Sequence, residues 1–351
     1  MAPHLSVCVV DPGQSGPTVG EGLPPPGRGM LKELGLWDDF LAQGHTEAQH
    51  SKAAWGSPIL QTNDFLLLGK GCGWTLDRPA FDRLLHARAA ACVDEMITGR
   101  LQHLQATAAG EWQATVDGQA VQSRTIIDAT GRAAVVTRLL GNRPRLEDKL
   151  VAVVREGTVP DDTETGVVVD AAPEGWWYSA PTSPGRRIWV WMTDSDLLRS
   201  QPAGDRTRWH QALAASKIMV SLARGARFDT WRIVPAMTQR APAAAGSCAY
   251  LCVGDAASCF DPASSQGIVK ALRSGLFAGY ALYDCLIKGD KTAFDRHRDH
   301  VNAEYVAYKS QHRLHYDAQT RWSDSPFWSR RTGNALDHAE PTTDHRQDEP
   351  A

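Results

Sequence analysis

Hydrophobic and polar positions follow recognisable periods along the chain and predict its elements. From Asp77 to Cys92, apolar residues recur at helical spacing behind an Asp-Arg-Pro start, which predicts a capped helix. The segments Trp112 to Val116 and Ala120 to Ile127 flank Asp117-Gly118, a pair typical of a tight turn, and predict a β-hairpin. An apolar run from Leu5 to Val10 predicts the first strand.

The stretch from Lys149 to Trp231 is rich in short apolar segments and aromatic residues and predicts an antiparallel sheet. Its expected strands are Val151 to Val154, Gly166 to Asp170, Trp176 to Ala180 and Ile188 to Met192. Neighbouring positions on a strand face opposite sides, so Trp176 and Tyr178 are expected on one face and Trp177 on the other. Helices are expected near Gly29 to Leu36, Arg206 to Ser216, Ser265 to Leu286 and Lys291 to His312.

The composition is that of a globular chain of enzyme size. Its 351 residues, 42% hydrophobic and 22% charged, can bury a large core. The net charge of −3 gives no electrostatic reason to bind nucleic acid or an anionic membrane. No apolar run approaches the ~20 residues of a membrane span, and Met1 to Val10 lacks the pattern of a signal peptide. Seven cysteines, without disulfide-framework or zinc-type spacing, favour free thiols in a reducing compartment, and we expect a cytoplasmic protein.

The segment LCVGDAASCFDPASSQG, residues 251–267, carries the most informative chemistry. An apolar strand ends at Gly254, and Asp255 follows it in position to hydrogen-bond a hydroxyl of a ribityl or pyrophosphate-linked chain. The loop bends at Pro262 before Gly267 and Ile268 open a helix, whose first amides would face an anion or a carbonyl group. This order suits a cofactor with a sugar-phosphate chain and a flat ring, while an ordinary turn is the alternative.

Three further segments accompany this turn. Thr125 to Arg132, TIIDATGR, is an apolar strand running into Ala129-Thr130-Gly131, where glycine permits a close backbone approach. Val19 to Pro25 reads VGEGLPP, and the helix that starts at Asp77 lies between these two segments. In this order the motifs resemble those of the FAD-dependent monooxygenase and tryptophan-halogenase superfamily. Near the C-terminus, RWSDSPFW from Arg321 to Trp328 resembles flavoproteins that mature protein-derived quinone cofactors, the glycine oxidase and lysine oxidase maturases.

The resemblance implies an α/β fold with a Rossmann-like FAD-binding domain, an antiparallel β-sheet domain on the substrate side, and C-terminal helices. The expected limits are 1–148 with 232–290 for FAD binding, 149–231 for the sheet, 291–332 for the helical region and 333–351 for a disordered tail. Members of the superfamily begin with a strand, a GxGxxG turn and a helix. Here the chain starts at the second strand, and Gly69 to Trp74 predicts a hairpin turn, so the GxGxxG unit is expected to be absent.

The resemblance also implies roles for individual residues. Contacts with FAD are expected from Asp11, Gly20, Arg78, Ala129, Thr130, Gly131, Gly254, Asp255, Pro262, Gly267 and Ile268. From the residues alone, Asp11 is alternatively a turn aspartate and Arg78 a solvated first-turn arginine. Glu21 is the first candidate for a catalytic carboxylate, or else an acid at a helix start. Trp176 and Tyr178 either roof a flat substrate or belong to the core of the sheet.

Flavin halogenases carry a lysine a few residues beyond the VGE segment, which handles the halogen oxidant, and a WxWxIP signature. Aligning that segment places Gly29 where the lysine belongs, with Lys32 three positions late, nearly a helical turn away. The second signature survives only as GWWYSAP from Gly175 to Pro181. We therefore expect flavin binding without halogenation.

The resulting interpretation is an FAD-dependent monooxygenase that hydroxylates an electron-rich aromatic, either a tryptophan side chain in a partner protein or a small indole or phenol. Reducing equivalents are expected from NAD(P)H or from a separate flavin reductase, because no second dinucleotide motif is visible. No nucleic acid partner, membrane span or metal is expected. A flavin-dependent halogenase, a geranylgeranyl-type lipid reductase and a truncated, non-catalytic flavoprotein remain as alternatives.

Overall fold

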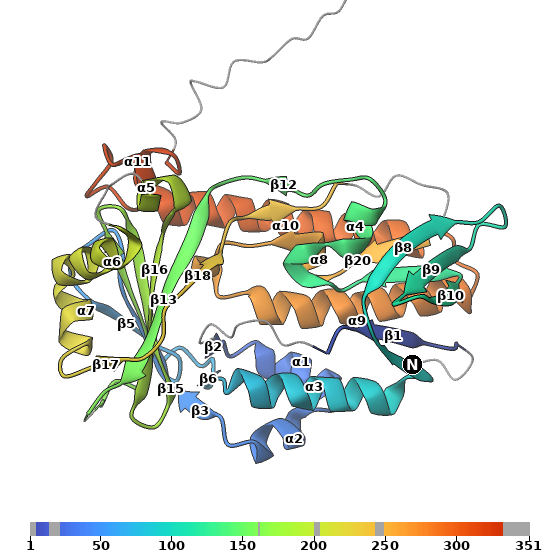
Figure 1. Ribbon diagram of the computed structural model, residues 1–351. Coiled ribbons are helices and arrows are strands. Elements are labelled where there is room, and N and C mark those ends of the chain that lie inside the picture. Colours follow the sequence, from blue (N-terminus) through green and yellow to red (C-terminus); the bar gives the residue numbers. More distant parts are fainter. Residues whose placement is uncertain (1–4, 14–21, 161, 200–203, 243–248, 333–351) are drawn as a thin grey trace, which may run out of the picture.

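The computed structural model describes residues 5–13, 22–160, 162–199, 204–242 and 249–332. A large sheet stands at one end of the molecule, two long helices run away from it, and smaller sheets and helices surround those helices (Figure 1). The mixed α/β architecture expected from the sequence is confirmed. The tail after Gly333 lies outside the described residues.

The large sheet has eight strands in the order β17-β13-β16-β15-β14-β4-β5, with β18 also paired to β13. The strands are β4 (His50–Ala54), β5 (Gln61–Asp64), β13 (Leu150–Thr158), β14 (Val167–Ala172), β15 (Gly175–Ser183), β16 (Arg186–Asp194), β17 (Arg227–Phe228) and β18 (Arg232–Pro235). All pairs are antiparallel except β14 with β4. The expected antiparallel sheet is therefore present, and it also recruits β4 and β5 from the N-terminal half of the chain.

The two faces of this sheet hold separate cores, as the alternation along β15 predicts. Trp176 packs on one face with Tyr316 and Trp328, and Tyr178 packs against the same cluster. Trp177 packs on the opposite face, in a cluster with Trp209. Helices α6 (Gly204–Ala215) and α7 (Lys217–Leu222) cover that second face (Figure 1).

Parallel strand pairs form the other half of the molecule. Strand β1 (Cys8–Asp11) pairs with β7 (Glu95–Thr98), and β11 (Thr125–Asp128) pairs with β20 (Ala249–Cys252). The expected hairpin is confirmed: β9 (Trp112–Val116) and β10 (Gln119–Ser123) are antiparallel, and β8 (Leu101–Ala106) pairs with β9. Asp117 and Gly118 both have positive φ, at 44° and 86°, which suits a tight hairpin turn.

Two small sheets and a set of helices complete the described fold. The sheets are β2 (Gly22–Leu23) with β3 (Thr46–Ala48) and β6 (Gly73–Thr75), and β12 (Arg145–Leu146) with β19 (Gln239–Arg240) and β21 (Ser258–Cys259). The remaining helices are α1 (Gly27–Glu33), α2 (Trp37–Ala42), α3 (Arg78–Cys92), α4 (Val135–Leu139), α5 (Ser195–Arg199), α8 (Gly254–Ala257), α9 (Gly267–Leu286), α10 (Ala293–Asp317), α11 (Pro326–Ser329) and the 3₁₀ turns η1 (Gly131–Ala133) and η2 (Pro262–Ser264). Helix α3 is capped as expected, because the Asp77 side chain accepts a hydrogen bond from the Ala80 amide at 2.9 Å.

Two local predictions were wrong. The segment from Gly69 to Trp74 is not a hairpin turn, because β5 pairs with β4 whereas β6 pairs with β2 and β3. Burial of Trp74, which meets the ring of Phe40 edge-on at 5.5 Å, holds β6 in a different sheet. Helix α10 also continues one turn beyond His312, since Tyr316 is buried against the large sheet. Within the described ranges, none of the helices combines the length and apolar character needed to cross a membrane.

Candidate active site

The strand β20 leads into a turn that only glycine fits well. Gly254 has φ of +55°, and a Cβ atom there would lie 3.2 Å from Cβ of Ala271 on α9. The Gly254 amide donates a hydrogen bond of 2.7 Å to Oγ of Ser274, one turn further along the same helix. The strand end is therefore fixed against α9, and Asp255 follows at its tip.

Asp255 forms an ion pair with Lys270 that no pattern in the sequence indicates. Nζ of Lys270 lies 2.8 Å from Oδ1 of Asp255, and it also donates to the carbonyl oxygen of Ser258. The same ammonium lies 4.4 Å from the centre of the Phe260 ring. The Lys270 side chain is 1% exposed and the Asp255 side chain 38% exposed, so the carboxylate keeps accessible surface for a ligand hydroxyl.

The N-terminus of α9 offers free hydrogen-bond donors. The N-cap residue, Gln266, makes no side-chain cap hydrogen bond, and the helix has 20 residues. Gly267 is exposed, and a Cβ atom added there would meet nothing within 4 Å. The first amides of α9, including that of Ile268, are thus suited to an anionic or carbonyl group, as the sequence predicts.

A second turn leaves the neighbouring parallel strand on the same side. Asp128 is paired in register with Cys252, so the turns after β11 and β20 begin at the same ends of adjacent strands. The buried carboxylate of Asp128 accepts hydrogen bonds from Oγ1 and the amide of Thr130, at 2.6 and 3.0 Å, and from the amide of Val136. Ala129 and Thr130 remain exposed, and Gly131 has φ of +62°. This turn is rigid and accessible, which suits contact with a ligand.

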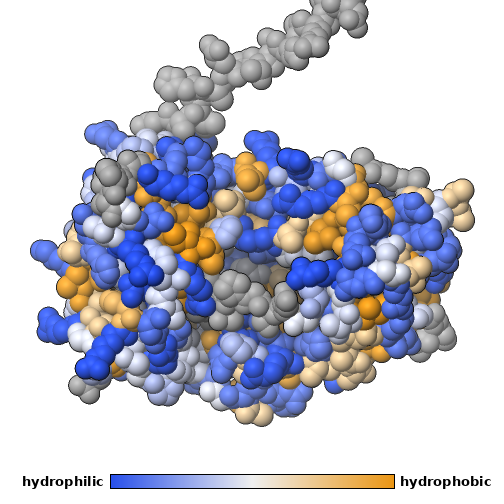
Figure 2. Space-filling model, in the orientation of Figure 1, coloured by the Kyte–Doolittle hydropathy of each residue, from blue (hydrophilic) through white to orange (hydrophobic). Residues whose placement is uncertain are grey.

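A cavity of about 450 Å³ lies between the loop that carries Pro262 and helix α10. Its wall includes Phe260, Ser264, Gln266, Tyr308, His312 and Tyr316. The Phe260 and Tyr308 rings stack at 4.0 Å, with an angle of 3° between their planes. The cavity therefore combines an aromatic wall with polar groups beside the start of α9. Seen from the side of Figure 2, the molecule is hollowed near its middle.

Asp261 is the hub of a buried hydrogen-bond network at this cavity. Its Oδ2 accepts from the hydroxyl of Tyr316 at 2.8 Å and lies 3.3 Å from Nε2 of His312. Its Oδ1 accepts from the amide of Ala263 at 2.8 Å. Burial acts to raise the pKa of Asp261, but the hydrogen bond and the charge interaction with His312, followed by the hydrogen bonds from Ala263 and Tyr316, outweigh burial and hold the pKa below its ordinary value. Asp261 is therefore an anion at neutral pH.

Two tyrosine hydroxyls contact Asp261 and stay protonated: that of Tyr316 at the carboxylate and that of Tyr308 at the backbone amide. The amide of Asp261 donates to the hydroxyl oxygen of Tyr308 at 2.8 Å. Burial, and then the charge of Asp261, raise the pKa values of Tyr308 and Tyr316. Neither residue was singled out in the sequence. The motif HRLHY from His312 to Tyr316, in which polar residues recur three or four positions apart on one helix, was the available signal.

The two expected substrate residues stand behind the cavity wall. Trp176 is 1% exposed, and its Nε1 donates to the hydroxyl of Tyr316 at 3.1 Å. Tyr178 is half-buried in the same cluster. Trp176 is thus linked to Asp261 by the Tyr316 hydroxyl. Direct contact of Trp176 or Tyr178 with a substrate stays a prediction.

Other expected site residues lie in their own local networks. Oδ1 of Asp11 accepts from the amide of Gly13 at 2.8 Å, and Oδ2 lies 3.9 Å from Nε2 of His86. The guanidinium of Arg78 contacts Asp82 at 3.0 Å on the first turns of α3. Their contacts with FAD stay predictions. Gly20 and Glu21 lie outside the described residues.

The position expected for a halogenase lysine is open. Gly29 lies on α1, where an added Cβ atom would meet nothing within 4 Å, and Lys32 is exposed on the same helix. Among the described residues that line the 450 Å³ cavity, none is a lysine.

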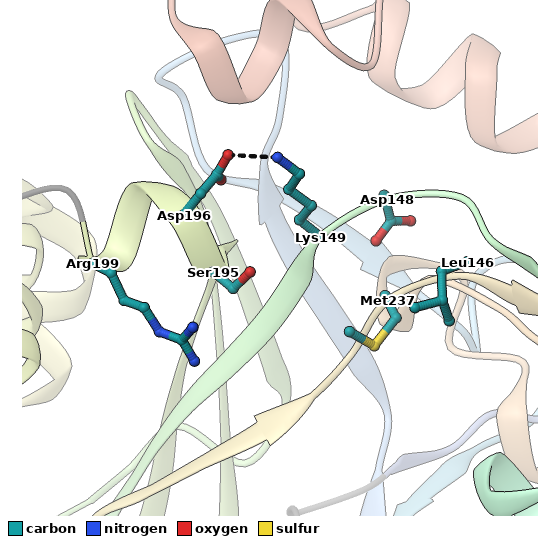
Figure 3. Close-up of a pocket in the computed structure, with 7 residues that line it drawn as sticks. All are labelled: Leu146, Asp148, Lys149, Ser195, Asp196, Arg199 and Met237. Carbon is teal, nitrogen blue, oxygen red and sulfur yellow. Dashed lines mark hydrogen bonds and ion pairs between the residues drawn. The ribbon is translucent and has the colours of Figure 1, made fainter.

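A second depression, of about 560 Å³, lies near α5 (Figure 3). Nζ of Lys149 lies 2.9 Å from Oδ2 of Asp196 across it. A hydrogen bond from Arg330 is the main cause that lowers the pKa of Asp196. The carboxylate of Asp148 accepts from the amides of Leu150 and Thr238. These carboxylates are engaged in holding the surface together, so the cavity at Asp261 is the better candidate site.

The groups at the ends of β11 and β20 and at the start of α9 fit the flavin half of FAD. Asp255 has an accessible carboxylate surface for a ribityl hydroxyl, and the α9 amides have room for a ring carbonyl because Gly267 has no side chain. The turn at Thr130 leaves the same edge of the parallel strands.

Comparisons with known proteins agree with this geometry. Residues 30–347 match the model of the tryptophan halogenase family. A curated relative, the putative FAD-dependent oxidoreductase LodB of Marinomonas mediterranea, is 28% identical over 295 residues, which cover 81% of this chain and 78% of that protein.

Solved structures share the fold at low sequence identity. The flavin-dependent halogenase CmlS is 22% identical, with a TM-score of 0.81 over 94% of this chain and 63% of that one. The myxobacterial chondrochloren halogenase CndH is 21% identical, with a TM-score of 0.80 over 95% and 83%. The peptidyl tryptophan dihydroxylase QhpG is 23% identical, with a TM-score of 0.73 over 93% and 73%. The chain thus spans less than two thirds of the CmlS structure. It belongs to the tryptophan halogenase family and is an FAD-dependent oxidoreductase.

Proposed function

We propose that the protein is a monooxygenase that hydroxylates an electron-rich aromatic ring, with a tryptophan side chain of a partner protein as its substrate. The observation that carries this proposal is the cavity of about 450 Å³ at the start of α9. It has an aromatic wall, a buried acid network and no lysine among its described lining residues.

The size and lining of the cavity support an aromatic substrate. The cavity volume of about 450 Å³ is within the range of about 300–1,000 Å³ common for ligand pockets of proteins, and it is large enough for an indole ring. Phe260, Tyr308 and Tyr316 give this wall its aromatic character, and Phe260 and Tyr308 are stacked on each other. Arg273 and Glu304 place charge in the same cavity, which disfavours a long isoprenoid chain and hence the lipid-reductase alternative.

The residues of this chain would bind FAD, orient the substrate and shield both from water. Bound FAD would supply the redox chemistry and the activation of dioxygen. Asp255, held by Lys270, would bind a ribityl hydroxyl, and the amides at the start of α9 would bind the polar edge of the ring. The aromatic side chains of the cavity wall would position the substrate and exclude water.

A peptidyl substrate is favoured over a free small molecule by the likeness to QhpG, a peptidyl tryptophan dihydroxylase with the same fold. Electrons would come from NAD(P)H or from a separate flavin reductase. The six cysteines in the described part of the chain are all free thiols, which supports a reducing, cytoplasmic location.

The test supplies the FAD-loaded chain with a flavin reductase, NADH and isotopically labelled dioxygen. Two substrates are compared: a partner protein with an accessible tryptophan, and free indole. Mass spectrometry should find one or two labelled oxygen atoms in the tryptophan-containing peptide. Oxygen incorporation into indole alone would replace the peptidyl substrate by a small aromatic one. Oxygen consumption that yields only hydrogen peroxide with every aromatic offered would refute the hydroxylase proposal.

A further inference from the structure

His312 occupies a distinctive place in the cavity. It lies on α10 one turn before Tyr316, its side chain is 13% exposed, and it lines the cavity. Its ring lies 4.4 Å from that of Tyr316 and 5.5 Å from that of Tyr308. The imidazole is thus held between two aromatic rings while one edge stays accessible.

The contact with Asp261 fixes which ring nitrogen carries the proton. A carboxylate can only accept hydrogen bonds, so Nε2 of His312 donates to Oδ2 of Asp261, 3.3 Å away. Neutral imidazole carries one proton, and Nδ1 is therefore left as a proton acceptor. Asp261 is itself fixed, because its side chain is 1% exposed and it also accepts from Tyr316 and Ala263.

We propose that His312 is a catalytic residue whose Nδ1 accepts the proton that the aromatic substrate loses on hydroxylation. This inference rests on the proposed function. In the overall reaction a ring C–H bond is replaced by C–O–H. One atom of dioxygen enters the product, the other leaves as water, and two electrons come from the nicotinamide or flavin reductant. The proton released from the ring carbon passes to His312.

Asp261 is the positioning residue for this step. Once His312 has accepted a proton, both ring nitrogens carry hydrogen, and the cation lies against a buried carboxylate of opposite charge. The same carboxylate orients the ring before the reaction through its contact with Nε2. General bases placed in this way accelerate proton transfer by about 10²–10⁴-fold.

The other titratable groups near His312 have different tasks. Tyr308 and Tyr316 flank it on α10, and burial raises their pKa values, so they stay protonated and neutral. His315 also lines the cavity, and its ring stacks on that of Trp55 at 4.2 Å. Arg273 and Glu304 are paired with each other at another part of the cavity wall. Arg331 lies over the ring of Tyr316, at 5.8 Å from its centre. Of the two described histidines that line the cavity, His312 is the one in contact with a carboxylate, that of Asp261.

The first experiment compares His312→Gln with wild type in single-turnover hydroxylation by the FAD-loaded chain. We expect product formation to fall about 100-fold or more, while FAD binding is retained and reduced flavin is diverted to hydrogen peroxide. The matched control is His300→Gln, an exposed histidine on the same helix. A wild-type rate in His312→Gln would overturn the proposal.

Two further measurements separate catalysis from structure. In His312→Ala, added imidazole should restore product formation, because the cavity has room for it, and the restored rate should rise with pH through the titration of imidazole. Lack of any rescue in a folded, FAD-bound variant would count against the role as proton acceptor. Asp261→Asn should lower the rate less than His312→Gln does, since it removes only the positioning charge.

A measurement that does not depend on hydroxylation tests the arrangement of His312 and Asp261 separately from the proposed function. Nitrogen chemical shifts of His312 in the wild-type chain should show the tautomer with hydrogen on Nε2. The opposite tautomer would overturn the arrangement with Asp261 whatever reaction the enzyme performs. The expected tautomer in an enzyme that hydroxylates no aromatic would refute the proposed function, and the role of His312 in hydroxylation with it.

Discussion

Nζ of Lys270 lies 2.8 Å from Oδ1 of Asp255, and the two side chains differ widely in exposure, at 1% and 38%. The ammonium lies on the buried side of the pair and the carboxylate on the accessible side. The desolvation cost of the pair therefore falls mainly on the lysine, which regains interactions from Asp255, the Ser258 carbonyl and the Phe260 ring. The pair holds the carboxylate in one orientation before any ligand arrives.

Replacing either member of this pair should have unequal consequences for folding. Asp255→Asn leaves a buried ammonium without its counter-charge, and we expect the free energy of unfolding to fall by about 3 kcal/mol. Lys270→Met leaves a carboxylate that solvent can reach, and we expect a loss of about 1 kcal/mol or less. Urea unfolding of both variants measures the difference.

The double variant Asp255→Asn with Lys270→Met provides the control. It should be more stable than Asp255→Asn alone, because the unpaired buried charge is gone. Equal losses in the two single variants, with simple additivity in the double variant, would contradict the ion pair as described here.

Substitution by alanine should lower the stability of the protein at Gly254 and leave it nearly unchanged at Gly267. Gly254→Ala forces a side chain into a backbone with φ of +55° and toward Ala271, and should cost about 1–3 kcal/mol of stability. Gly267→Ala has open space, and its stability should change by less than about 0.5 kcal/mol.

Gly267→Ala should weaken FAD binding although it leaves stability nearly unchanged. Its methyl group projects beside the first amides of α9, so we expect FAD affinity to fall about tenfold, or about 1.4 kcal/mol. Thermal unfolding and flavin fluorescence titration, made on both variants, check the two halves of the prediction. Unchanged affinity in Gly267→Ala would remove the α9 N-terminus from the cofactor site.

The turn after β20 could be predicted because backbone geometry limits which residues fit there. Gly254 has a positive φ and lies close to Ala271, and a glycine at the end of an apolar strand is the sequence signature of such a turn. The alternation of Trp176 and Trp177 between two cores follows from strand geometry in the same way.

The acid network could not be predicted, because its members come from distant parts of the chain. Asp261 meets His312 and Tyr316 only when the loop before α9 packs against α10, 51 and 55 residues later. The burial of Lys270 could not be predicted from the sequence either, because a lysine on a helix is normally exposed to solvent. The prediction of a hairpin turn from Gly69 to Trp74 was wrong for a related reason. The burial of Trp74 depends on tertiary packing, which local sequence does not show.

Stability should decline as pH falls below neutrality because of neutral, buried histidines. Burial lowers the pKa of His297, which is 4% exposed, and likewise that of His45, whose Nδ1 accepts the Asp77 amide. Both groups bind protons more readily in the unfolded chain, where the ordinary pKa is 6.5. Stability is therefore complete above pH 6.5 and is lost as pH falls toward the lowered folded values.

Unfolding free energies measured between about pH 8 and pH 5 test this sign. His297→Gln should flatten the slope relative to wild type, whereas the exposed His300→Gln should leave it unchanged. A stability that rises on acidification over this interval would contradict the neutral, buried state of His297.

The last prediction concerns halogen chemistry. Halogenases with this fold deliver an oxidised halogen through a lysine, but Gly29 has no side chain and Lys32 is exposed on α1. The cavity at Asp261 has no lysine among its described lining residues, and an anionic carboxylate at its wall disfavours a second anion such as bromide. With bromide, dioxygen, reduced flavin and a tryptophan-containing substrate, the enzyme should therefore add oxygen and no bromine. The bromine isotope pattern makes the product unmistakable by mass spectrometry, and its appearance at a rate comparable with oxygen addition would place an oxidant-handling lysine elsewhere in the chain.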